Sequence, residues 1–285
     1  YAGADNAEYQ LAWAWKLSGQ EAKAAAVFAR LAAAHPKSPL AAEAHHHVGE
    51  AAYQAQDYQK AAEAYFEASQ KAAGSELGEK ASHKLAWSFF HLGQFARALQ
   101  SFRYQQGAYP KGPREQDAAF MAAECLFKQG KFAEALEAYK EVRGPSSKEF
   151  HAQALLHAGQ AAAQLKQWPK SLELLAGAAA QFPDSASIPE ILYEKGWAQQ
   201  NLNQTDQALE SYRAVIEKSG REAAARAQCM IGEIQFERKQ HEKAVESFLK
   251  VTYGYSYPRW QADAAFEAGR CFEAMGMKSQ AIKVY

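Results

Sequence analysis

Histidine and cysteine are the residues of this chain best suited to chemistry, because both bind metals and both serve in catalysis. His45, His46 and His47 are consecutive, so on a helix they project about 100° apart and cannot all face one metal ion. His46 and His83 hold equivalent positions in the repeating pattern described below, and His91 lies two turns beyond His83. A metal site could use these side chains, but we favour their interpretation as partly exposed helix histidines. We therefore predict no metal and no cofactor.

The three cysteines show no pairing pattern. Cys125, Cys229 and Cys271 lie at least 42 residues apart, form no CxxC motif and have no metal-ligand spacing. We interpret them as small residues in helix packing; an odd, unpaired set is typical of a reducing compartment. The chain also lacks a glycine-rich phosphate loop, an HExxH motif and a GxSxG elbow, and its carboxylates are scattered. We predict that it is not an enzyme and has no catalytic residues.

The elements that must position these residues recur eight times, at intervals of 36 or 37 residues. Each repeat has an opening small residue, a second small residue twelve positions later and a large apolar residue four positions after that. The opening residues are Ala12, Gly49, Ala86, Ala123, Gly159, Gly196, Gly232 and Gly269. The second small residues are Ala24, Ala61, Ala98, Ala135, Ser171, Ala208, Ala244 and Ala281, and the large residues are Phe28, Tyr65, Phe102, Tyr139, Leu175, Tyr212, Phe248 and Tyr285. Small residues let helices approach and large ones fill the adjoining space, so the period predicts a solenoid of stacked helix pairs.

Glycine and proline mark the expected helix boundaries. The turn within a pair is best made by a left-handed glycine or asparagine, and such residues occur at Gly19, Gly93, Gly130, Asn203 and Gly276. Eight of the nine prolines fall between repeats and Pro169 falls in a turn within one, so none interrupts a helix. Ser38 before Pro39 predicts an N-cap followed by a first-turn proline.

This pattern, with a proline near the repeat end as in Tyr109-Pro110 and Phe182-Pro183, resembles the tetratricopeptide repeat along essentially the whole chain. The family repeat is about 34 residues long, and here extra residues lengthen the second helix or the following turn. The resemblance implies an all-α, right-handed superhelical solenoid of about eight helix-turn-helix repeats, forming a single solenoid over 1–285. The expected repeats are 5–38, 42–75, 79–112, 116–149, 152–185, 189–222, 225–258 and an incomplete 262–285.

Shorter segments, such as His35-Pro36-Lys37-Ser38-Pro39, are similar to those of two bacterial envelope members of the family. These are the Tol-Pal coordinator proteins and the outer-membrane assembly lipoprotein BamD. This narrower likeness favours a bacterial periplasm or cell envelope over the cytoplasm. Tyr1 is not a start methionine, and the sequence stops at Tyr285 inside the second helix of the eighth repeat, so we expect an excised piece whose last repeat frays.

Charge and hydropathy narrow the classes of partner. Basic and acidic residues balance at 32 each, and no basic stripe with interleaved aromatics occurs, which disfavours nucleic acid. No apolar run approaches the roughly 18 residues that span a bilayer, so we expect no membrane insertion. A protein or peptide partner remains.

The first helix of each pair is expected, from the resemblance, to line a concave groove. Residues three before, one after and four after each opening small residue share one face of that helix. The predicted partner-binding residues on this face are Tyr9, Trp13, His46, Tyr53, His83, Trp87, Phe90, Phe120, Phe127, Tyr193, Trp197, Phe236 and Phe266. Because the opposite face supplies the packing within each repeat, these rings exceed what the core requires.

Two interpretations of this aromatic stripe stay open: packing against the next repeat, or a groove for an extended peptide or a partner helix. Family members that clamp a C-terminal carboxylate use Lys and Asn at these inner positions; here the first offset never holds Lys and the middle one never holds Asn. We predict a non-catalytic protein-interaction scaffold that binds a peptide or protein in the aromatic groove. The alternative is an assembly module of a bacterial envelope complex that contacts further repeats or subunits.

Overall fold

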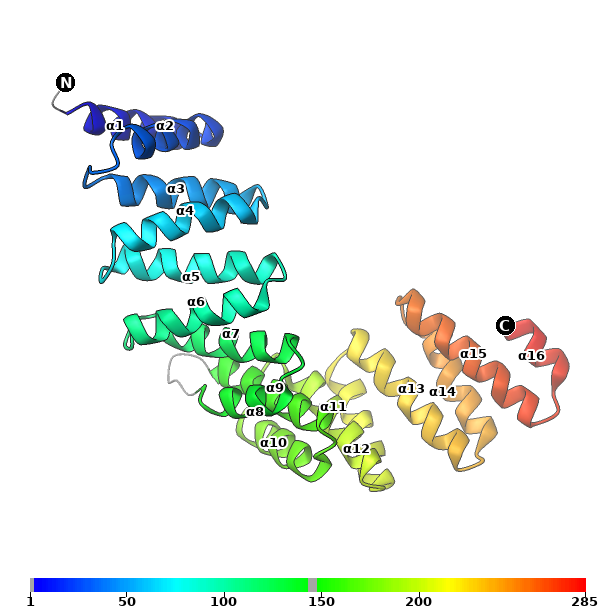
Figure 1. Ribbon diagram of the computed structural model, residues 1–285. Helices are drawn as coiled ribbons and strands as arrows, with labels where there is room; N and C mark the ends of the chain where they lie inside the picture. Colours follow the sequence, from blue (N-terminus) through cyan, green and yellow to red (C-terminus); the bar gives the residue numbers. More distant parts are fainter. Residues whose placement is uncertain (1–2, 143–147) are drawn as a thin grey trace. The chain divides into compact units, whose positions relative to one another are not determined.

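The computed structural model describes residues 3–142 and 148–285, and these form sixteen α-helices and no strand. The expected all-α helical-repeat solenoid is confirmed (Figure 1). The helices form two compact units, which we call unit 1 (α1–α8) and unit 2 (α9–α16). Unit 1 contains α1 (Ala4–Leu17), α2 (Glu21–Ala34), α3 (Ala41–Gln54), α4 (Tyr58–Lys71), α5 (Glu76–His91), α6 (Phe95–Ala108), α7 (Glu115–Lys128) and α8 (Phe132–Lys140). Unit 2 contains α9 (Lys148–Gln164), α10 (Trp168–Gln181), α11 (Ile188–Asn201), α12 (Thr205–Lys218), α13 (Glu222–Glu237), α14 (His241–Gly254), α15 (Pro258–Ala274) and α16 (Lys278–Val284).

Within each unit, every helix packs against the next one in the chain, and some odd-numbered helices also contact each other. Such contacts join α3 with α5 in unit 1, and α9 with α11, α11 with α13 and α13 with α15 in unit 2. In each unit, we call the surface on the side of the odd-numbered helices that carries the predicted partner-binding residues the odd-helix surface.

The repeating small and large residues make the core of each helix pair. The large residues from Phe28 to Phe248 are at most 1 % exposed, whereas Tyr285 is 55 % exposed. A Cβ atom added at Gly232 would lie 2.7 Å from the Phe248 ring, so glycine is needed there for the helices to approach. The same close approach occurs at Gly49, Gly159, Gly196 and Gly269. The spacing in the sequence therefore reflects direct contact between the two helices of a pair.

A left-handed residue ends the first helix of each pair. The glycines and the asparagine expected in these turns all have positive φ, for example 70° at Gly93 and 59° at Asn203. The remaining turns were not predicted, because Gln56, Lys166 and Lys239 take the same conformation at φ between 57° and 60°. In every case the residue stands seven positions after the opening small residue.

Two details of the expected boundaries need comment. Ser38 is not an N-cap, because α3 begins at Ala41; its hydroxyl instead accepts the Leu40 N–H and donates to Asp5. Residues 143–147 of the expected repeat 116–149, Pro145 among them, lie outside the described residues. No helix in the described part of the chain combines the length and the apolar character needed to cross a bilayer.

Candidate functional site

The thirteen predicted partner-binding residues all lie on odd-numbered helices. His83, Phe120 and Tyr193 are buried, Phe266 is 56 % exposed, and the other nine are half-buried. Nine of the thirteen belong to unit 1 and four to unit 2. The stripe therefore forms two surfaces, one on each unit.

Many of these rings take part in the packing of their own repeat. Tyr9 and Trp13 meet the Phe28 ring edge-on, with ring centroids 6.1 and 6.3 Å away. The corresponding contacts are His46 and Tyr53 with Tyr65, His83 and Trp87 with Phe102, Phe120 with Tyr139, Tyr193 with Tyr212, and Phe266 with Tyr285. These rings therefore also pack against the buried large residues of five repeats, namely Phe28, Tyr65, Phe102, Tyr139 and Tyr212.

Other contacts reach the next repeat. The Trp13 ring lies edge-on to His47, with centroids 5.0 Å apart, and Tyr53 lies 5.6 Å from His91. The Trp87 indole N–H lies 3.3 Å from an Asp117 carboxylate oxygen on α7. Both interpretations of the stripe thus have support: the rings pack within and between repeats, and most still present part of their surface to solvent.

A polar network joins α1 to α3 in unit 1. The Tyr9 hydroxyl donates to Glu43 at 2.6 Å, and the Lys16 ammonium lies 3.0 Å from His47 Nδ1. Burial, and then the Lys16 charge, lower the pKa of His47 to about 4. His47 is therefore neutral near pH 7, and its Nδ1 accepts a hydrogen bond from the Lys16 ammonium.

The next set of contacts forms what we call the α3–α5 cluster, made of Tyr53 on α3, Lys84, Trp87 and His91 on α5, and Tyr58 at the start of α4. The Lys84 ammonium lies 4.5 Å above the Tyr53 ring and 3.8 Å from the Glu50 carboxylate. The His91 imidazole stacks on Tyr58 with centroids 4.6 Å apart and lies 5.7 Å from Trp87. The cluster combines partly exposed rings with polar tips on one surface.

A tyrosine hydroxyl holds a carboxylate on this surface in two repeats. Tyr65 donates to Glu50 at 2.5 Å from inside the core, and Tyr139 donates to Glu124. Burial, followed by the carboxylate in each case, raises the pKa of both tyrosines. These glutamates were not predicted as site residues, although they occupy the same offset as Trp13 and Trp87.

The odd-helix surface of unit 2 combines aromatic rings with carboxylates and arginines. The Arg226 guanidinium stacks 3.9 Å from the Tyr193 ring centre and pairs with Glu190 at 3.0 Å. Glu194 is buried and accepts a hydrogen bond from Gln160; burial is the main cause that raises its pKa. Trp197 packs edge-on against Trp168, and Arg270 lies over Phe236.

A cavity of about 230 Å³ also lies on unit 2. Glu233, Asp263 and Glu267 line it together with Cys229, Trp260 and Phe266, among others. Burial and the nearby Glu267 raise the pKa of Glu233. Unit 2 therefore presents an acidic aromatic surface.

The cysteines and histidines singled out at the start do not assemble into a reactive centre. All three cysteines are free and buried, and burial raises the pKa of Cys125 and Cys229 to about 12 and that of Cys271 to about 11. Such thiols are poor nucleophiles. Among the residues that the structure describes, no group of three or more His, Cys, Asp or Glu side chains is arranged to hold a metal ion.

Comparisons with known proteins agree with this geometry. A tetratricopeptide-repeat family model matches residues 18–76, 83–149 and 193–257, and a second model with the same description matches 153–185. No curated protein sequence is similar enough to the chain to count as a match.

Solved structures show the same fold. The apo form of RapI is 15 % identical, with a TM-score of 0.66 over 98 % of this chain and 81 % of that protein. A tetratricopeptide repeat protein from Parabacteroides merdae is 13 % identical, with a TM-score of 0.57 over 98 % of both chains. YrrB, described as a TPR protein with an unusual peptide-binding site, is 21 % identical, with a TM-score of 0.51 over 62 % of this chain and 86 % of that one.

The tetratricopeptide repeat is in general a non-catalytic interaction module, and none of these comparisons indicates an enzyme family. Because the family models match well over half of its residues, this chain belongs to the tetratricopeptide repeat family, whose fold supports a scaffold for protein–protein interaction.

Proposed function

We propose that this chain is a non-catalytic scaffold that holds a peptide or a partner protein against its odd-helix surface, and that the α3–α5 cluster is the main anchor. The observation that carries the proposal is the half-buried state of Trp87 and of Tyr53, whose ring lies beneath the Lys84 ammonium. Tyrosine and tryptophan supply large contact areas at low conformational-entropy cost, and they are enriched where interfaces concentrate their binding energy. Binding here makes and breaks no covalent bond.

The chemistry of the surface narrows the partner. Rings that already pack in the core are held rigidly, so they lose little freedom when a partner covers their remaining surface. Lys84 and His91 stand among these rings and can meet carboxylate or carbonyl oxygens of a peptide. YrrB, with the same fold, is described as having a peptide-binding site, which supports a peptide as the ligand class.

An assembly role in a bacterial envelope complex is the alternative proposal. It would use the same surfaces against further repeats or subunits. Affinity capture with this chain as bait separates the two, because an assembly module retains subunits of one complex, whereas a peptide-binding scaffold retains proteins that share a short segment.

A peptide-display selection tests the groove directly. Peptides selected on the parent are measured against the double variant Trp87→Ala, Phe127→Ala. Loss of anchors of this kind costs about 2 kcal/mol or more, which is roughly a thirty-fold weaker Kd. Tyr253→Ala is the matched control, because Tyr253 is exposed on an even-numbered helix and should leave binding unchanged. Circular dichroism checks that each variant is folded; equal binding by the folded double variant contradicts the proposal.

A further inference from the structure

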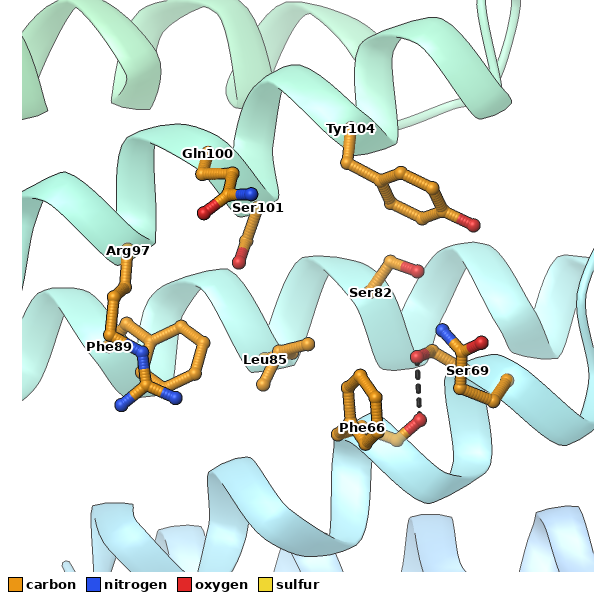
Figure 2. A pocket seen from close by; sticks show the side chains of 10 residues that line it. Phe66, Ser69, Ser82, Leu85, Phe89, Arg97, Gln100, Ser101 and Tyr104 are labelled. Atoms are coloured by element: carbon orange, nitrogen blue, oxygen red, sulfur yellow. Dashed lines mark hydrogen bonds between the residues drawn. The ribbon is translucent and has the colours of Figure 1, made fainter.

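A cavity in unit 1 lies on the side of α5 that faces away from the odd-helix surface, and we call it the α4–α6 groove (Figure 2). Its volume is about 290 Å³, and it is bounded by α4, α5 and α6. At 100° per residue, the α5 residues that line it point about 130° around the helix axis from the mean direction of His83, Trp87 and Phe90 on the odd-helix surface. The lining residues are Phe66, Ser69, Gln70, Ser82, Leu85, Phe89, Arg97, Gln100, Ser101 and Tyr104.

Two exposed rings flank this groove. Phe66 on α4 is 49 % exposed and Tyr104 on α6 is 53 % exposed, and in Figure 2 they stand on opposite sides of α5. Leu85 and Phe89 form an apolar floor between them. Exposure of two large rings over an apolar floor costs solvation free energy that a bound apolar side chain would recover.

The floor also holds an unsatisfied polar group. Ser82 is only 2 % exposed, and its hydroxyl has no hydrogen-bond partner among the described residues. Figure 2 places this hydroxyl between Tyr104 and the α4 side chains. A buried hydroxyl without a partner costs about 1–3 kcal/mol, a cost that a ligand group reaching this hydroxyl would remove. A peptide group can do so, since a hydroxyl both donates and accepts.

One cationic side chain, that of Arg97, lines the groove at the end away from Tyr104. Arg97 is the only charged residue in the lining; its guanidinium stacks 4.0 Å from the Phe89 ring centre and donates to the neutral Gln94 amide. It pairs with no carboxylate in the described part of the chain. Along α6, Arg97 lies seven residues from Tyr104, which corresponds to about 10 Å.

The fold itself does not require these side chains. In the neighbouring repeats, the positions equivalent to Phe66, Tyr104 and Arg97 hold alanine or charged residues. In that order they are Ala29, Glu67 and Lys60 between α2 and α4, and Arg103, Glu141 and Glu134 between α6 and α8. Neither neighbour carries a ring at any of these positions, so the two rings of the α4–α6 groove are a local feature of one repeat pair.

We propose that the α4–α6 groove is a second binding site, which takes an extended acidic peptide segment of a partner protein. One large apolar side chain of the segment lies between Phe66 and Tyr104, a backbone peptide group bonds the Ser82 hydroxyl, and a carboxylate pairs with Arg97. An extended segment in the polyproline II conformation has three residues per turn and advances about 3.1 Å per residue, so side chains three residues apart share one face and the carboxylate comes three residues from the apolar side chain. This site is independent of the one proposed on the odd-helix surface.

The test uses two capped decapeptides in a glycine–serine background, each with a phenylalanine at the fourth position. One has glutamate at the seventh position and its twin has glutamine. Fluorescence polarisation with the full chain should show the glutamate peptide binding about ten-fold more tightly, because a charge-assisted pair to arginine is lost in the twin. Arg97→Gln should make the two peptides equal, whereas Arg103→Gln, the same charge change on an exposed α6 residue outside the groove, should preserve the difference.

Ser82→Ala adds a readout that a structural role would not give. Removing an unsatisfied hydroxyl should leave the melting temperature unchanged or raise it, while the affinity for the glutamate peptide falls several-fold. Trp87→Ala should not change this affinity, which separates the groove from the odd-helix surface. Equal binding of the twins by the parent, absence of saturable binding, or a difference that survives Arg97→Gln would overturn the proposal.

Discussion

The odd-helix surfaces of the two units differ in chemistry although the repeats beneath them pack alike. In unit 1 rings and histidines contact one another on this surface, as Trp13 and His47 do. In unit 2 arginines stack on the rings, as Arg226 does on Tyr193, and three carboxylates line a cavity beside Phe266. The large residues from Phe28 to Phe248 are nevertheless equally buried in both units. The repeat therefore dictates the positions where its helices touch and leaves the outer positions of the first helix free to specialise.

The largest expected effect tests the shared packing. Ala98→Leu in unit 1 and Ala208→Leu in unit 2 each enlarge a residue with no exposed surface. Overpacking a close contact costs about 1–3 kcal/mol, and we expect similar losses in both units. Urea denaturation followed by circular dichroism measures them. Ala96→Leu, at an exposed position on α6, is the control and should change stability little. If either buried variant were as stable as the parent, the two units would not share the same close helix packing.

The second effect compares the hydrogen bonds that two equivalent buried tyrosines donate, one to a charged and one to a neutral acceptor. Tyr65 donates to the Glu50 carboxylate at 2.5 Å in unit 1, whereas Tyr212 donates to the neutral Gln200 amide at 3.2 Å in unit 2. Bonds to charged groups contribute more, so Tyr65→Phe should cost about 2 kcal/mol and Tyr212→Phe about 1 kcal/mol. Chemical unfolding at pH 7 gives both values. A larger loss for Tyr212→Phe would reverse the expected order.

The third effect is a difference in pH dependence between the units. The pKa of His47 is lowered to about 4, so its neutral form stabilises unit 1 above pH 6.5 and this stability is lost as the pH falls toward 4. The pKa of Glu194 is raised, so its contribution is present below pH 4.5 and lost as the pH rises through the folded pKa.

Thermal unfolding of two variants measures that difference. The free energy of unfolding of His47→Phe, relative to that of the parent, should rise as the pH falls from 7 to 5. The reason is that only the parent loses stability when His47 is protonated in the unfolded chain. Glu194→Gln should be more stable than the parent at pH 7, and this advantage should shrink at pH 4. Changes of the same sign in both variants would remove the contrast between the units.

The smallest effect concerns exposed ion pairs, which should contribute equally little in both units. Lys80 pairs with Glu76 at 2.9 Å in unit 1, and Lys250 pairs with Glu246 at 2.7 Å in unit 2. Lys80→Ala and Lys250→Ala should each cost less than about 0.5 kcal/mol, and less still in high salt. A loss above about 1 kcal/mol in either would mean that surface charge also helps to hold that unit together.

The sequence predicted those features that follow from steric contact. The opening glycines, the second small residues and the buried rings keep fixed spacing because each touches the other inside one helix pair, as Gly232 and Phe248 do. Glycine and asparagine turns were predicted for the same reason. The left-handed Gln56, Lys166 and Lys239 were not, since these residues carry no signal of positive φ and the repeat imposes the conformation on them.

The site was only partly predictable. The stripe of rings was found from helical spacing, but its contact with the buried large residues depends on how far each ring leans toward the second helix, which spacing does not specify. The α4–α6 groove was missed altogether. Its rings come from second helices of two successive repeats, and only the packing brings Phe66 and Tyr104 to one cavity.

The left-handed turns are positions between which a pair of helices can be deleted from the chain. Gly93 and Gly130 have nearly the same φ and stand 37 residues apart. A chain in which Gly93 is followed directly by Lys131 would lose α6 and α7 as a module and keep one intact turn at the junction. Tyr139 would then meet Ala86, an opening small residue of the same size as its native neighbour Ala123, so the shortened protein should fold with one helix pair fewer and without the α4–α6 groove.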